Sequence, residues 1–81
     1  MRIILRDGEK FSGSPLKIVS QMKGSTVFSD VKTISEYVDM VLRNAKMLEG
    51  IELNVKGNTD KELARSLVDE LLRHGLATEV K

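Results

Sequence analysis

Apolar and polar residues recur along the chain with periods that change from segment to segment, and these periods predict its elements. The longest helical pattern runs from Thr33 to Gly50. Its main apolar face comprises Ile34, Tyr37, Val38, Val41, Leu42, Ala45 and Leu48. Thr33 and Glu36 have the spacing of a capping box, and Gly50 suits a left-handed residue after the last turn. We therefore predict a central helix over this range.

The apolar arc of this central helix is wider than one core requires. Met40 and Met47 lie beside the main face and widen the arc to roughly 220° on a helical wheel. A helix that covers a core from one side needs an apolar stripe of only ~100°. Asn44 is the one polar residue inside the arc. The pattern therefore indicates apolar surface that faces something besides the helix's own core.

The C-terminal third alternates between strand and helix patterns. Residues 51–56 place Ile51, Leu53 and Val55 on one side with period two, which predicts a half-buried strand. Thr59 and Glu62 form a second capping box, and the helix that they begin runs to about His74. Residues 76–80 can form a last short strand. The stretch 51–80 therefore resembles a right-handed βαβ crossover.

The N-terminal third predicts a hairpin and a short helix. Residues 2–6 and 9–12 have strand character, and Asp7-Gly8 between them is a strong signal for a tight hairpin turn. Ser14 and Pro15 are suited to the N-cap and first position of a helix, which we expect over 15–23. Residues 24–32 could form a loop or a short extended segment, and we assign them to a loop.

Together these elements predict an α+β fold in the order β-β-α-α-β-α-β. We expect a two-layer sandwich, in which an N-terminal hairpin and a C-terminal βαβ unit build a small mixed sheet with the helices on one face. Neither an internal repeat nor a linker is visible, so residues 1–81 are predicted to form a single domain.

Composition limits both stability and location. A chain of 81 residues has a small core, and its complete lack of cysteine excludes disulfides and thiolate metal sites. The chain start lacks the pattern of a signal peptide, and no apolar run approaches the ~20 residues of a membrane span. We expect a cytoplasmic protein that does not bind a membrane.

The residue types that carry catalysis are sparse. His74 is the one histidine, and its place at a predicted helix end favours a structural role. The acidic residues fall mostly on polar helix faces, and neither a phosphate-binding loop nor a nucleophile elbow is present. We predict that the protein is not an enzyme, and we assign no catalytic residue, cofactor or metal site.

Two functional hypotheses remain, with a third in reserve. The first is a module that binds a partner or itself, with a homodimer favoured, through the candidate interface residues Tyr37, Met40, Asn44 and Met47; alternatively, the hairpin or the 24–32 loop covers this patch. The second is a nucleic-acid-associated module that uses Arg2, Arg6, Lys10, Lys17 and Lys23, although 13 basic against 12 acidic residues give no general excess. The third is a small-ligand-binding protein or enzyme with a site between subunits.

Overall fold

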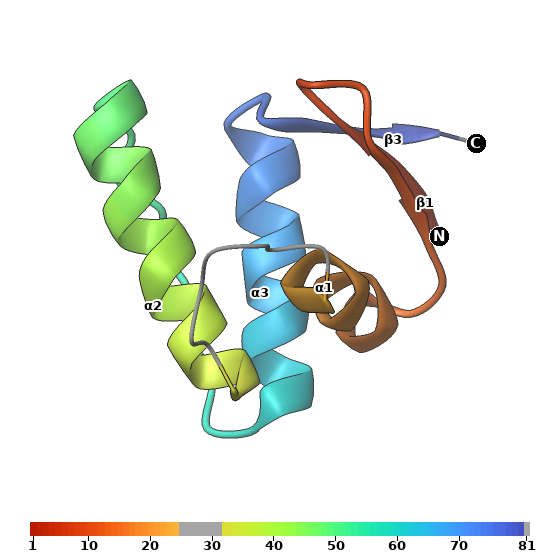
Figure 1. Cartoon of the computed structure of the whole chain (residues 1–81), viewed down its shortest axis with the longest axis horizontal. Coiled ribbons are helices and arrows are strands. Elements are labelled where there is room, and N and C mark those ends of the chain that lie inside the picture. Colours follow the sequence, from red (N-terminus) through yellow and green to blue (C-terminus); the bar gives the residue numbers. More distant parts are fainter. Residues whose placement is uncertain (25–31, 81) are drawn as a thin grey trace.

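Three strands and three α-helices form two layers in the computed structural model, which describes residues 1–24 and 32–80. Along the chain, the elements are β1 (Arg2–Leu5), β2 (Lys10–Ser12), α1 (Pro15–Gly24), α2 (Ile34–Asn44), the π-helical turn η1 (Ala45–Glu49), α3 (Asp60–Arg73) and β3 (Ala77–Val80). The helices lie on one side of the sheet (Figure 1). The predicted α+β class, with helices on one face of a small sheet, is confirmed.

The sheet has β1 in its centre and is antiparallel throughout. Ile3 lies opposite Phe11 of β2 and opposite Glu79 of β3. The predicted hairpin is confirmed, because the Gly8 amide donates to the Leu5 carbonyl at 2.9 Å and closes the turn between β1 and β2. The mixed sheet that we predicted is wrong, since β3 pairs antiparallel with β1.

Residues 51–56 keep their predicted place in the order of elements but do not join the sheet. Their burial alternates as predicted, with Leu53 buried and its two neighbours exposed. The Asn54 amide donates to Glu70 Oε1 at 2.6 Å, and the Lys56 amide donates to Ser66 Oγ at 2.9 Å. In place of the predicted βαβ unit, residues 51–56 lie along α3, and the backbone amides of Asn54 and Lys56 donate hydrogen bonds to side chains of that helix.

The spacing of these two hydrogen bonds explains why a helix can replace a strand here. Two residues of an extended chain advance by about 6.6 Å, and four residues of an α-helix advance by about 6 Å. Donors two residues apart therefore match acceptors four residues apart on α3. A period of two shows that one side of a segment is buried, but it does not show which element pairs with its backbone.

The predicted helix starts are confirmed in detail. The Thr33 hydroxyl accepts from the Glu36 amide at 3.1 Å at the start of α2, and the Thr59 hydroxyl accepts from the Glu62 amide at 3.2 Å at the start of α3. Ser14 Oγ caps α1 by accepting from the Lys17 amide. Of the loop predicted for 24–32, residues 25–31 lie outside the described part of the chain.

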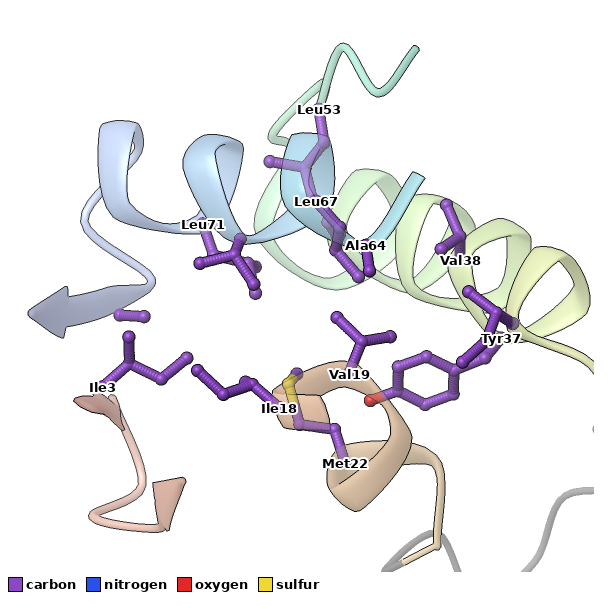
Figure 2. Packing of buried hydrophobic residues seen from close by; sticks show 14 residues of the cluster. Ile3, Ile18, Val19, Met22, Tyr37, Val38, Leu53, Ala64, Leu67 and Leu71 are labelled. Carbon is purple, nitrogen blue, oxygen red and sulfur yellow. The ribbon is translucent and has the colours of Figure 1, made fainter. Parts of the chain in front are cut away.

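The core lies between α1, α3 and β1. Its largest fully buried side chains are Ile3, Ile18, Val19, Leu67 and Val68. Figure 2 shows that Ile3 of the sheet points towards Ile18 of α1, while Val19 lies between α1 and α3. α2 packs against α3 and runs parallel to it, because the connection over residues 50–59 returns the chain to the end at which α2 began (Figure 1).

Candidate partner-binding surface

The central helix changes its geometry at the end of α2. Residues up to Asn44 are α-helical, and Ala45–Glu49 form a π-helical turn that ends at Gly50, whose φ of 66° lies in the left-handed region. A π-helical turn closes from residue i to i+5 and is therefore wider than an α-helical turn. Side chains after Asn44 consequently leave the angular positions that an α-helical wheel assigns to them.

Leu48 shows the consequence most clearly. It follows Tyr37 by about three α-helical turns and was expected on the same buried face. Instead Leu48 is 80% exposed, as is Met47, whereas Tyr37 is buried. The expectation for Leu48 is corrected, and the cause is the π-helical turn. Short π-helical segments of this kind are frequent at functional sites.

We call the mainly apolar residues around this turn the α2–η1 face. Its residues are Tyr37, Met40, Val41, Asn44, Met47 and Leu48. All of them except Met47 line a groove of about 280 Å³, which Leu76 also lines. The groove continues towards the hairpin turn and β3, where Tyr37 and Val41 face Leu5 and Leu76.

Two ion pairs lie near the α2–η1 face. Arg6 of the hairpin turn donates to Glu49 Oε2 at 2.6 Å, and Lys46 Nζ lies 3.6 Å from Glu52 Oε1. Because all four side chains are 42% exposed or more, each pair contributes little to stability. Each of these two acidic and two basic groups therefore already lies beside a group of opposite charge.

Three of the four candidate interface residues, Tyr37, Met40 and Asn44, line the groove, and the four differ in exposure. Tyr37 is buried at the bottom of the groove, Met40 is half-buried, and Asn44 and Met47 are exposed. Sequence reasoning placed Leu48 in the core and so missed the residue that is exposed as much as Met47. No signal in the sequence distinguishes a π-helical turn before Gly50 from an ordinary last turn.

The five basic residues considered for nucleic acid do not gather in one place. Arg2 and Lys10 share the outer face of the sheet, which the helices do not cover, and both line a shallow pocket there. Arg6 lies beyond the other end of β1 and is paired with Glu49. Lys17 and Lys23 belong to α1.

His74, the one histidine of the sequence, lies beside a carboxylate of its own helix. His74 Nε2 lies 3.9 Å from Glu70 Oε1, and that buried carboxylate also accepts the Asn54 amide. Within residues 1–24 and 32–80, no three His, Asp or Glu side chains are grouped so that they could hold a metal ion. Among the described helices, none has the length and apolar character to cross a membrane.

Comparison with known proteins gives no assignment. No protein-family model, curated protein sequence or solved structure matches the chain.

Proposed function

We propose that the protein is a small, non-catalytic α+β module that self-associates, with a homodimer as the working form, through the α2–η1 face. The observation that carries this proposal is the 80% exposure of Met47 and Leu48, two large apolar side chains that are adjacent in sequence on one turn. Methionine adapts its shape readily and is common at binding surfaces. Exposed apolar side chains that lie together, beside an apolar groove, are typical of interaction sites.

The size of the chain supports the same proposal. A domain of about this size buries a smaller part of its surface than larger domains do, so its stability has a narrow margin. Burying apolar surface against a second copy contributes roughly 25 cal/mol per Å² of area removed from water, before the costs of association are subtracted. Self-association through this face would therefore both stabilise the fold and hide its exposed apolar residues.

Light scattering coupled to gel filtration tests the proposal. We expect the wild-type chain of 9.1 kDa to elute with twice that mass at micromolar concentration and to dissociate on dilution. Leu48→Glu and Met47→Glu are each expected to give the monomer mass with an unchanged circular dichroism spectrum, because both positions are exposed. A wild-type chain that is monomeric over the whole concentration range overturns the proposal.

Val80→Glu provides the matched control. It introduces the same charge at an exposed apolar residue, but on the outer face of the sheet. We expect this variant to remain a dimer. If Val80→Glu dissociates the protein and Leu48→Glu does not, the interface lies on the sheet instead of on the α2–η1 face.

A second candidate function is binding of nucleic acid by the outer face of the sheet. The register places six residues on this face, namely Arg2, Ile4, Lys10, Ser12, Thr78 and Val80. None of these six is acidic, so the face is locally basic although the whole chain has a net charge of only +1. Phosphate groups would be attracted to such a surface, most strongly at low salt.

A gel-shift titration with labelled single-stranded DNA and RNA at low salt tests this second candidate. We expect Arg2→Glu and Lys10→Glu to abolish any shift, while Lys61→Glu, which changes an exposed lysine on α3, leaves it unchanged. Wild-type protein that shifts neither probe at low salt eliminates the candidate.

A further inference from the structure

Apolar residues on the central helix are distributed symmetrically about Asn44. Val41 and Met47 lie three positions to either side of it, and Met40 and Leu48 lie four positions to either side. Both pairs are apolar on both sides, and the residue at the centre is the one polar member of the face.

This symmetry matters because of the geometry of two identical helices that pack antiparallel. When a twofold axis passes through one residue of each helix, residues at equal distances before and after that residue come opposite each other. A twofold axis at Asn44 therefore brings Met40 to the same position along the seam as the partner's Leu48, and Val41 to that of the partner's Met47, while the π-helical turn sets the direction in which Met47 and Leu48 point. The apolar residues of one copy then meet only apolar residues of the other.

We propose that the occupant of the α2–η1 face is a second copy of this chain, bound antiparallel with Asn44 of both protomers on the twofold axis. This inference rests on the proposed self-association and adds its register. An asparagine side chain has both a carbonyl acceptor and amide donors, so it can pair reciprocally with an identical side chain across the axis. A single polar residue inside an apolar helix seam is known to fix register and oligomeric state in coiled coils.

The charges around the face are consistent with a copy of the same chain as the partner. Glu49 is already compensated by Arg6, and Lys46 is already paired with Glu52. In the proposed register, Asp39 lies opposite the partner's Glu49, whose charge the partner's Arg6 offsets. The border therefore does not require a strongly charged partner of either sign.

Disulfide cross-linking tests the register, and the cysteine-free chain gives it no background. In the antiparallel arrangement, a mixture of Met40→Cys and Leu48→Cys chains forms a heterodisulfide as its dominant product, because these residues come to the same position along the seam. Met40→Cys alone gives little dimer, since two copies of position 40 are eight residues, or about 12 Å of helix, apart along the axis. Asn44→Cys alone cross-links efficiently. Lys61→Cys on α3 is the control and stays monomeric on denaturing gels.

The outcomes separate the register from the association itself. A dimer by light scattering in which Met40→Cys cross-links with itself, and the mixture gives no heterodisulfide, overturns the antiparallel register but leaves the proposed function standing. A monomer by light scattering overturns both. Asn44→Asp provides a second readout, because it keeps the size of the side chain and places two carboxylates on the axis. We expect this variant to dissociate the dimer while the fold is retained; an undiminished dimer places Asn44 away from the axis.

Discussion

Glu70 is the one charged residue that the described part of the chain buries. Its carboxylate accepts the Asn54 amide at 2.6 Å, and Arg73 and His74 of the same helix lie 3.7 Å and 3.9 Å from it. A hydrogen bond to a charged acceptor is stronger than one between neutral groups. Glu70 therefore holds residues 51–56 against α3.

Replacing Glu70 tests this role. Glu70→Met keeps the length of the side chain but leaves the Asn54 amide without its acceptor, so we expect the free energy of unfolding to fall by about 1–3 kcal/mol. Glu70→Gln retains an acceptor oxygen and should lose less. Urea denaturation measures both, with Asp69→Asn at the exposed neighbouring position as the control. Equal stability of Glu70→Met and wild type would contradict the assigned role.

Gly57 is a second residue whose identity the packing dictates. A Cβ atom at this position would lie 2.8 Å from the Leu63 amide nitrogen and 2.7 Å from Glu62 Cβ, and the first of these is backbone that cannot move aside. We therefore expect Gly57→Ala to lower the free energy of unfolding by more than about 1 kcal/mol. Gly24→Ala is the control, because nothing lies within 4 Å of a Cβ there. Comparable denaturation midpoints for the two variants would refute the close approach.

At the scale of elements, residues 51–56 show how a chain can follow a strand pattern without a strand partner. Every second backbone amide of the segment donates a hydrogen bond. The Asn54 and Lys56 amides donate to α3 side chains, whereas the Leu53 and Val55 amides have no acceptor within the described residues. The segment is thus fixed along one edge of its backbone.

Hydrogen exchange followed by NMR tests this arrangement. We expect the Asn54 and Lys56 amides to exchange more slowly than those of Leu53 and Val55, because exchange of a bonded amide requires a local opening. Ser66→Ala should raise the exchange rate of Lys56 and leave that of Asn54 nearly unchanged. Uniform protection along 53–56 would instead indicate that both edges of the segment are paired.

The elements that the sequence predicts correctly are those whose signals are local. Thr33 and Thr59 cap their helices because a hydroxyl reaches an amide three residues further on, and Asp7-Gly8 turns the hairpin without help from the rest of the fold. The partner of 51–56 and the direction of Leu48 were predicted incorrectly. Both depend on tertiary contacts or on a π-helical turn, which composition and period do not encode.

Some residues of the candidate interface could be proposed from the sequence, because the apolar arc of a helix is also a local signal. Met40, Asn44 and Met47 stand out on a helical wheel because the apolar arc is too wide; in the structure Met40 and Asn44 line one groove, and Met47 is exposed. Tyr37 has the same pattern but is buried by the core, and Leu48 was assigned to the core but is exposed. Angular position alone therefore identifies the side of the helix but not the depth of each residue.

At the scale of the whole molecule, association would couple folding to concentration. A partner that binds only the folded chain adds stability by mass action, about 2.7 kcal/mol when it is present at one hundred times its dissociation constant. For a domain of this size, 1 kcal/mol moves the melting temperature by about 4–8 °C. We expect the wild-type melting temperature to rise by several degrees over a hundredfold increase in protein concentration.

Leu48→Glu is the matched comparison for this measurement. Its melting temperature should be independent of concentration, because the variant removes the partner and leaves the core untouched. Differential scanning calorimetry at several concentrations distinguishes the two cases. A wild-type melting temperature that does not depend on concentration would count against association in the folded state.

The parallel course of α2 and α3 has an electrostatic consequence. Each helix carries a dipole equivalent to roughly half a positive charge at its start and half a negative charge at its end. Because residues 51–56 return the chain before α3 begins, both starts lie at one end of the molecule and both ends lie at the other (Figure 1). Dipoles that lie side by side and point in the same direction repel each other. Arg6 and His74 lie near the C-terminal ends of the two helices. In an antiparallel second copy, α2 would run opposite to α2 of the first, and the attraction between these two dipoles would offset the repulsion that the connectivity of a single chain imposes.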